Sequence, residues 1–490
     1  MKEYKLFIQR IGLIGFTNIL IALSNLILLI ILTKNFSINE YGIWVQFYTT
    51  LVLLPNIATL GLPYTFVRYF SAETNKKKIQ RGFYSIFSLV LISSFLISLF
   101  LCIFSQSIAN LLFNGESNIT MILSLVVFFA SLNVFLLNFF RTFQKMKKYS
   151  IFLILQTYLG VFLISYFAIE GFGIFITALG LLISNFITFL IMVILIALEI
   201  DFIIPKFKNT RKYLSFGLPT IPTSLSYWII ESSDRYIIGI MLGTAFVGYY
   251  SPGYVLGNLI LMIAAPFNLL LPSILPKYYE EGNVEKVKIF LKYSVKYFLL
   301  IAIPSVFVIS ILSKNLLILL TTPDIALNGY YITPFVALSA LLFGLYGNIA
   351  NIIILKKETK ILGFSWIIAA IFNIIFNIMF IPYIGILAAA IMTLLAYLIA
   401  LIITLFYSYK YFNFEFDLKF IFKCVFTSII ISMIIVFINP VGILNILIVI
   451  GISFLVYLIL VLILGCIKKE EIILLKSLIM SNNYDKINKL

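Results

Sequence analysis

The sequence predicts an all-α integral membrane protein of about 14 transmembrane helices, with two six-helix lobes related by a parallel repeat and two further C-terminal helices. The 490 residues are 62% hydrophobic and only 11% charged, whereas soluble domains carry about 25% charged residues. Apolar stretches of about 20 residues or more, long enough to cross a bilayer as helices, follow one another along the chain. Basic residues collect in alternate connections between these stretches.

Each apolar stretch is expected to be a helix, although many are rich in Ile and Val. In lipid the backbone of an open sheet edge stays unsatisfied, and only helices and closed barrels avoid this cost. A barrel would need short alternating segments, and these stretches are continuous. The predicted spans are 11–33, 41–66, 83–105, 119–140, 150–169, 173–197, 214–241, 246–275, 291–313, 330–354, 361–381, 383–407, 420–438 and 440–465.

The distribution of basic residues predicts the orientation. With the N-terminus in the cytoplasm, all but three of the 35 Lys and Arg residues lie on the cytoplasmic side; the exceptions are Lys34, Arg235 and Lys314. Because cytoplasmic loops are enriched in Lys and Arg, both termini are expected to be cytoplasmic in a multi-pass protein of the inner or plasma membrane. The connections are too short to hold a catalytic domain, and no GxxxxGK[ST] phosphate loop is present.

The composition excludes several kinds of chemistry. The chain has no His, so a histidine base, relay or metal ligand is impossible. Its three Cys residues (Cys102, Cys424 and Cys466) lie in separate apolar segments without metal-binding spacing. We expect no catalytic residues, no metal and no cofactor beyond a coupling ion, H⁺ or Na⁺. The basic charge is dispersed in short loops, so no nucleic-acid partner is expected.

Two pairs of segments suggest an internal repeat. Residues 39–70 resemble 245–279, with Gly42 matching Gly248, and residues 171–187 resemble 383–399, with Gly173 matching Gly385. Both pairs are six spans apart, and an even number of spans preserves orientation, so the repeat is parallel. The predicted units are residues 1–200 as an N-terminal lobe, 201–410 as a C-terminal lobe, and 411–490 as two helices with a cytoplasmic tail. Two such lobes can enclose the central cavity of an alternating-access transporter.

The seventh span holds the densest polar cluster in the apolar part of the chain. Glu231, Asp234 and Arg235 share one helix face, and a charge in hydrocarbon costs at least about 2.5–3.5 kcal/mol unless it is paired or hydrated. Arg235 could contact an anionic substrate, or the acids could couple an ion. Equally, a Glu231–Arg235 pair could lock helix packing.

Other candidates have weaker signals. Pro219 and Pro222, near the start of the same span, predict a hinge because proline kinks a helix. Arg68 and Arg141 end the second and fourth spans, where arginine suits phosphate recognition or marks the headgroup level.

Two pairs of asparagines lie within spans. Asn18 and Asn25 share a face of the first span, and Asn373 and Asn377 share a face of the eleventh. Either pair could line a polar path, and interhelical hydrogen bonding is the competing interpretation.

Residues 215–260 resemble the polysaccharide-biosynthesis flippases of the Wzx type, which belong to the MATE-like MOP superfamily. The residues that carry the resemblance are Gly217-Leu218-Pro219, Ser233-Asp234-Arg235 and Val247-Gly248-Tyr249-Tyr250. The segments around Glu40-Tyr41-Gly42 and at 141–150 are also similar. The resemblance extends over essentially the whole chain.

The resemblance implies a flippase, not an enzyme, that carries a polyprenyl-diphosphate-linked oligosaccharide from the cytoplasmic to the outer leaflet for cell-surface polysaccharide (for example O-antigen) synthesis. It implies a cationic cavity, membrane lipids as surroundings, and a polysaccharide polymerase or other assembly proteins as partners. A cation-coupled multidrug exporter of the same fold is the alternative. The acids of the first lobe lie at or near span ends, which disfavours it. A third interpretation is a membrane enzyme such as an oligosaccharide polymerase, ligase or acyltransferase. Such enzymes usually have a long outer loop or a catalytic His, and the chain has neither.

Overall fold

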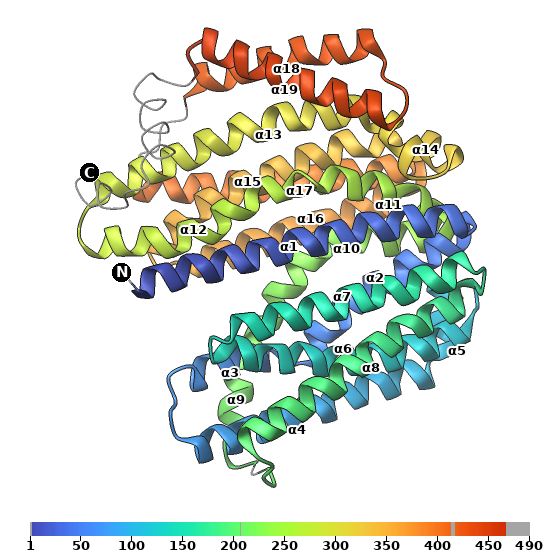
Figure 1. Ribbon diagram of the computed structural model, residues 1–490, viewed down its shortest axis with the longest axis vertical. Coiled ribbons are helices and arrows are strands. Elements are labelled where there is room, and N and C mark those ends of the chain that lie inside the picture. The colour runs from blue at the N-terminus through green and yellow to red at the C-terminus, as the bar shows by residue number, and fades with distance from the viewer. Residues whose placement is uncertain (1, 206, 413–416, 467–490) are drawn as a thin grey trace.

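The computed structural model describes residues 2–205, 207–412 and 417–466, and this part of the chain is helical without a β-strand. The predicted cytoplasmic tail, from residue 467, lies outside the described residues. The first group of helices packs around α6, and Figure 1 shows it in blue and green in the lower half of the molecule, with α1 at its upper border. This group contains α1 (Lys2–Asn35), α2 (Ile38–Ala58), α3 (Leu62–Phe70), α4 (Lys76–Ile103), α5 (Ser105–Leu112), α6 (Ser117–Thr142), α7 (Met146–Ile169) and α8 (Gly173–Ile200).

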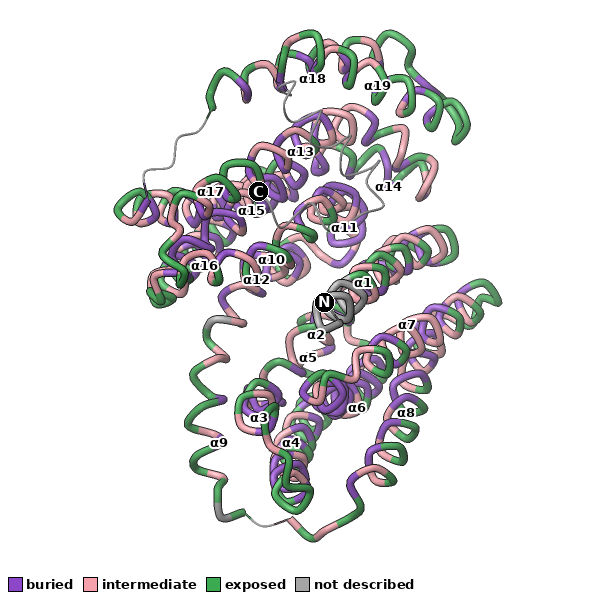
Figure 2. The backbone as a smooth tube through the Cα atoms, turned by 60° about the vertical axis from the view of Figure 1, so that its left-hand side comes forward, coloured by how far each residue is buried: buried purple, intermediate pink, exposed green. Residues whose placement is uncertain are grey.

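The second group packs around α15, and the last two helices lie on the outer side of α13 (Figures 1 and 2). A connection of η1 (Phe207–Asn209), α9 (Thr210–Gly217) and η2 (Leu218–Thr220) leads into it. The group contains α10 (Ile221–Leu242), α11 (Thr244–Asn258), α12 (Leu261–Glu280), α13 (Val284–Leu320), α14 (Pro323–Gly329), η3 (Tyr330–Ile332), α15 (Thr333–Leu355), α16 (Thr359–Ile384) and α17 (Ile386–Tyr411), followed by α18 (Leu418–Ile438) and α19 (Ile443–Ile463).

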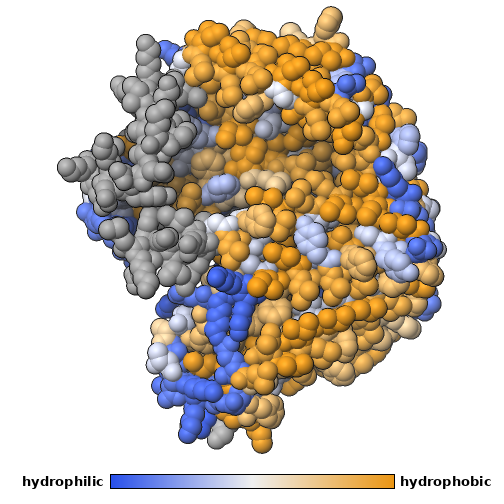
Figure 3. Space-filling view, viewed as in Figure 1, coloured by the Kyte–Doolittle hydropathy of each residue, from blue (hydrophilic) through white to orange (hydrophobic). Residues whose placement is uncertain are grey.

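The exterior of the bundle is apolar between its two ends. In Figure 3 hydrophobic residues cover most of the visible face, and hydrophilic residues gather at the lower left, where α3 and α9 lie in Figure 1, with smaller groups at the right edge. We call the left-hand end, with the start of α1 and the ends of α2 and α6, the basic end, and the opposite end, where α2 and α11 begin, the neutral end. Such an apolar band is the surface that a bilayer requires of a spanning protein.

The predicted number of spans agrees closely with the structure. Twelve helices of the described chain are long and apolar enough to span a membrane, and the bent pair α2–α3 makes a thirteenth. The predicted seventh span, α10, is long enough at 22 residues. It carries three ionisable side chains, so composition alone does not identify it as a membrane-spanning helix. Those three side chains belong to the site described below.

Three spans predicted as continuous are broken. α2 and α3 meet at an angle of 48° because Leu60 and Gly61 adopt left-handed backbone conformations with φ of 53° and 66°, where Gly is favoured. The seventh span is α9, a 3₁₀ turn and α10, and the eighth is α11 followed by α12.

The matched glycines of the proposed repeat occupy equivalent places. Gly173 begins α8 with φ of 77°, and Gly385 precedes α17 with φ of 71°. Gly42 and Gly248 meet each other where α2 packs on α11: a Cβ on Gly42 would lie 1.9 Å from the carbonyl oxygen of Thr244 and 3.3 Å from the amide of Gly248. Both segments of the first matched pair therefore line the seam between the two groups of helices.

Candidate functional site

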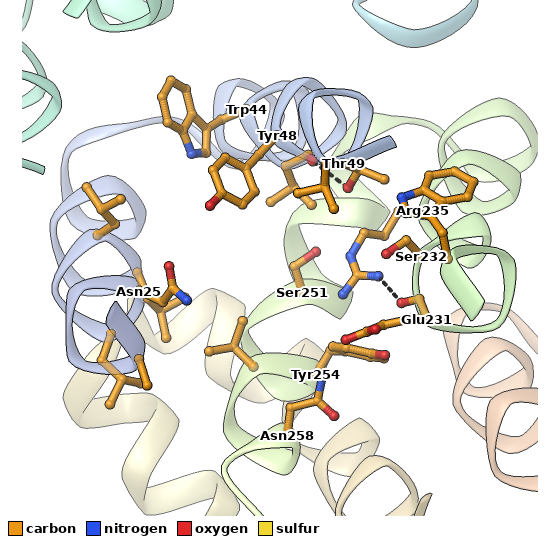
Figure 4. A pocket seen from close by; sticks show the side chains of 18 of the residues that line it. Asn25, Trp44, Tyr48, Thr49, Glu231, Ser232, Arg235, Ser251, Tyr254 and Asn258 are labelled. Atoms are coloured by element: carbon orange, nitrogen blue, oxygen red, sulfur yellow. Dashed lines mark hydrogen bonds between the residues drawn. The ribbon is translucent and has the colours of Figure 1, made fainter. Parts of the chain in front are cut away.

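A cavity of about 760 Å³ lies between the two groups of helices, within the range of about 300–1,000 Å³ that is common for ligand sites. We call it the chamber. α1 and α2 form one wall, and α10, α11 and the start of α12 form the other. Figure 4 shows the side chains of these helices around a common space. The polar and aromatic lining includes Asn25, Trp44, Tyr48, Thr49, Asn56, Tyr64, Ser224, Tyr227, Trp228, Glu231, Ser232, Arg235, Ser251, Tyr254 and Asn258.

Arg235 reaches the chamber from α10 and is held on several sides. Its Nη1 lies 3.2 Å from Oδ1 of Asp234 and donates to the Glu231 carbonyl oxygen at 2.7 Å. Its guanidinium carbon lies 4.2 Å from the centre of the Tyr254 ring, a cation–π contact. Arg235 is 9% exposed and Asp234 is fully buried. The second carboxylate oxygen of Asp234 accepts a hydrogen bond from the Tyr250 hydroxyl.

The charges of α10 therefore do not form the pair considered from the sequence. Arg235 makes its ion pair with Asp234 rather than with the Glu231 carboxylate. Asp234 does not line the chamber, whereas Glu231 and Tyr227 do. Asp234 orients and neutralises Arg235 from behind, while the Glu231 carboxylate remains available to a ligand.

The charge of the chamber differs from the cationic cavity that the resemblance implied. Of the described residues in its lining, Glu231 is the single acid and Arg235 the single base. Since Asp234 already balances Arg235, the chamber has no excess of positive charge. The sequence could not show this, because the pairing of Arg235 depends on rotamers that spacing does not determine.

Aromatic side chains form both walls of the chamber. Trp44, Tyr48 and Tyr64 come from α2 and α3, and Tyr227, Trp228 and Tyr254 come from α10 and α11. Trp228 is 9% exposed, and its indole N–H has no hydrogen-bond partner among the described residues. Sequence reasoning missed these residues because aromatic side chains make up 16% of the chain, and nothing in their spacing separates lining from core.

Behind Arg235 lies a buried polar cluster that joins three helices. Ser233 of α10 donates to Asn373 of α16 at 3.4 Å, and Asn373 donates to Thr393 of α17 at 3.5 Å. Asn377 donates to Asn373 at 3.1 Å, and both asparagines are fully buried. Interhelical hydrogen bonding, not a polar path, is therefore the role of this pair.

The other sequence candidates are dispersed. Asn25 lines the chamber, whereas Asn18, two turns earlier on α1, is exposed outside it. Arg68 is exposed in the last turn of α3, away from the chamber. Arg141 lines a small recess of about 80 Å³.

That recess adjoins the chamber at the basic end. Asn56, Tyr64 and Ser224 line both spaces, so Arg141 lies in a recess next to the chamber. Asn138 and Thr220 contribute further polar groups to the recess. Arg141 is exposed and forms no ion pair with a described residue.

The two prolines lie at a helix boundary. Pro219 is in η2 and Pro222 is in the first turn of α10, where the amide that proline lacks would have no helical partner. They therefore mark the break between α9 and α10 instead of kinking one helix. The hinge role remains a proposal for this break.

The neutral end of the chamber is closed. Thr244 at the start of α11 donates to Asn39 of α2 at 3.2 Å and accepts from Asn114 at 2.9 Å. The tight contact at Gly42 and Gly248 lies in the same seam. These contacts block access to the chamber from the neutral end.

The closed seam also buries a side chain whose polar groups are unpaired. Gln46 of α2 is fully buried against Gly239 of α10, and neither its amide nitrogen nor its oxygen has a partner in the described chain. Such groups are rare in folded proteins because they carry a desolvation cost of about 1–3 kcal/mol each. Separation of α2 from α10 would hydrate Gln46, and this hydration would offset part of the packing energy of the closed seam.

Metal binding finds no support in the described residues, where no group of three or more His, Cys, Asp or Glu side chains is placed to hold an ion. Cys102, Cys424 and Cys466 are free thiols.

Comparison with solved structures shows the same fold in transporters. The lipid II flippase MurJ, in an inward closed conformation, is 19% identical with a TM-score of 0.74, over 92% of this chain and 98% of that chain. An inward-facing MATE family multidrug resistance transporter is 18% identical with a TM-score of 0.65, over 80% and 94%. A MOP superfamily transporter from Pyrococcus furiosus, noted for reverse polarity of its binding pocket, is 16% identical with a TM-score of 0.56, over 82% and 95%.

Family models agree with the fold. No curated protein matches the sequence. A MatE model matches residues 219–379, which cover α10 to most of α16. A polysaccharide biosynthesis protein model matches residues 7–276, which is more than half of the chain. The chain therefore belongs to the polysaccharide biosynthesis protein family, and its fold is that of the MOP superfamily of flippases and transporters.

Proposed function

We propose that this protein is a flippase that moves a polyprenyl-diphosphate-linked oligosaccharide from the cytoplasmic to the outer leaflet by alternating access. The observation that carries the proposal is the chamber between the lobes, closed at its neutral end and lined by aromatic rings, hydroxyls and amides. A sugar cannot cross hydrocarbon without replacing its hydration, because each unpaired hydroxyl costs several kcal/mol there. Tyr and Trp offer flat apolar faces together with a polar group, which suits the two chemical faces of a sugar ring.

Arg141 is the best candidate for the phosphate-binding residue. It has no acidic partner among the described residues, and its recess shares Tyr64 and Ser224 with the lining of the chamber. Guanidinium groups bind phosphate oxygens in a bidentate manner. In this arrangement the oligosaccharide occupies the chamber, the diphosphate lies at the basic end, and the lipid tail stays in the membrane.

The surrounding system follows from the same proposal. The protein lies in the cell membrane with its basic end facing the cytoplasm, because Lys and Arg are enriched on the cytoplasmic side of membrane proteins. Energy comes from an H⁺ or Na⁺ gradient acting through Glu231 and Asp234 of α10, or from consumption of the product outside. A polysaccharide polymerase or another assembly protein is the expected downstream partner.

A multidrug exporter is the second candidate, favoured by the MatE match over residues 219–379 and by the aromatic chamber walls. An exporter would accept amphipathic cations without a diphosphate. The two functions therefore differ in their need for Arg141, since a cationic drug gains nothing from a guanidinium.

Replacing Arg141 with Ala should lower flipping of a fluorescent polyprenyl-diphosphate oligosaccharide in proteoliposomes by about 10–100-fold, the equivalent of one charge-assisted hydrogen bond or two. Flipping is measured as protection of the sugar label from a membrane-impermeant quencher. Arg81→Ala is the matched control, because Arg81 is also exposed at the basic end but lies outside the recess. Equal flux in the two variants, or export of cationic dyes without any flipping, would contradict the proposal.

A further inference from the structure

The electrostatics of the chamber restrict the sugars that it can accept. Arg235 meets Asp234 at 3.2 Å, the Glu231 carbonyl oxygen at 2.7 Å and the Tyr254 ring at 4.2 Å. Its positive charge is thus already balanced within α10 and α11. Glu231, by contrast, lines the chamber and forms no ion pair with a described residue. A ligand in the chamber therefore meets an acidic side chain, and no described cation in the lining is free to pair with a carboxylate of the ligand.

We propose that the chamber selects uncharged oligosaccharides and rejects glycans that carry carboxylates, such as those containing uronic acids. The inference rests on the proposed flippase function and specifies its substrate class. A carboxylate on the sugar would lose its hydration beside Glu231 and find no free cation to pair with. Burying an unpaired charge is costly, so the chamber would bind an acidic glycan less well than a neutral one. No other described residue in the chamber lining can supply that cation.

The same groups suit neutral sugars. A carboxylate accepts hydrogen bonds from hydroxyls without a change in charge, so Glu231 can bind the hydroxyls of a hexose. Asn25 and Asn258, on opposite walls, add amide donors and acceptors. The unpartnered indole N–H of Trp228 is a free donor in the same lining, and a sugar oxygen would satisfy it.

The inference also accounts for the separation of the two charged sites. The diphosphate would be repelled from Glu231, as an acidic sugar would be, so it must remain outside the chamber. Arg141 supplies an unpaired cation in the adjoining recess. Glu231 and Arg141 together would thus fix the direction in which the substrate lies, with neutral sugars inward and phosphates at the basic end.

The test compares two lipid-linked substrates that differ in one group, a neutral hexose oligosaccharide and the same oligosaccharide with one hexose replaced by its hexuronic acid. We expect the wild-type protein in proteoliposomes to flip the neutral substrate at least about tenfold faster, a ratio worth about 1.4 kcal/mol. Glu231→Gln should reduce that ratio to within about twofold, and Asn25→Asp should enlarge it. Asn25→Leu is the matched control, since it should slow both substrates and leave the ratio unchanged.

A binding measurement keeps the inference testable where a variant flips slowly. Of three Trp residues in the chain, Trp44 and Trp228 line the chamber, and Trp366 is buried in the second lobe. The neutral oligosaccharide, freed from its lipid, should quench the fluorescence of the purified protein, and Trp44→Phe should weaken the signal. Equal flipping or equal quenching by the acidic glycan in the wild type would overturn the inference but leave the flippase function intact. Failure to flip either substrate would overturn both.

Discussion

Replacing Arg235 with Ala should abolish translocation, with at least about a 100-fold loss of flux. The variant leaves the fully buried Asp234 carboxylate with the Tyr250 hydroxyl and a backbone amide but without its cation. Breaking a buried ion pair in this way costs about 3–5 kcal/mol. It also removes from the chamber the cation that holds the Tyr254 ring and the Glu231 carbonyl oxygen in place. Flux in proteoliposomes and thermal unfolding of the purified protein measure the two effects separately.

A double variant distinguishes a role in transport from a role in packing. Asp234→Asn combined with Arg235→Ala removes both charges, so the unfolding temperature should recover most of the loss seen in the single variant. Translocation should not recover, because the chamber still lacks the guanidinium. Recovery of both properties would show that Arg235 merely neutralises Asp234. Arg235→Lys keeps the positive charge but loses the planar guanidinium group. Its flux should therefore lie between those of Arg235→Ala and the wild type.

Gly42→Ala should lower flux strongly by destabilising the closed neutral end. A Cβ at Gly42 would lie 1.9 Å from the Thr244 carbonyl oxygen and 2.6 Å from its carbonyl carbon, and a backbone group cannot rotate away. Over-packing costs about 1–3 kcal/mol, which shifts a closed–open equilibrium by about 5–150-fold. Reactivity of a cysteine introduced at Ser251 in the chamber, toward an impermeant thiol reagent added from the neutral side, should rise by a similar factor.

The control for this variant is Gly451→Ala in α19, because a Cβ there would meet nothing within 4 Å. It should leave the flux and the cysteine reactivity close to those of the parent protein. Unchanged reactivity in Gly42→Ala, with normal insertion and unfolding temperature, would show that the seam at α2 and α11 does not gate the chamber.

The sequence predicted the fold well because the bilayer imposes strong constraints on length and charge. The length of each continuous apolar stretch was enough to predict a spanning helix. Helices α1 (Lys2–Asn35) and α17 (Ile386–Tyr411) are examples. The breaks were harder to place. Leu60 and Gly61 interrupt the second span through their φ angles, and Leu–Gly alone gives no strong turn signal in an apolar run.

The site was predicted only in part, for a related reason. Arg235 and Glu231 stood out because a charge is costly in lipid, and both line the chamber. Their partners could not be assigned, since i,i+1 and i,i+4 pairings depend on side-chain rotamers. Asn18 and Asn25 share a helix face, yet they are seven residues and therefore about 10 Å apart along α1, and only Asn25 reaches the chamber.

The central claim, that the lobes must part at the neutral end for transport, is tested most directly by a reversible crosslink. Asn39→Cys and Thr244→Cys would join α2 to α11 where their side chains now hydrogen-bond at 3.2 Å, in a background without Cys102, Cys424 and Cys466. Oxidation should reduce flux of the lipid-linked oligosaccharide to the level of empty liposomes, and dithiothreitol should restore it, while either single variant stays insensitive. Undiminished flux through fully crosslinked protein would contradict alternating access at this seam.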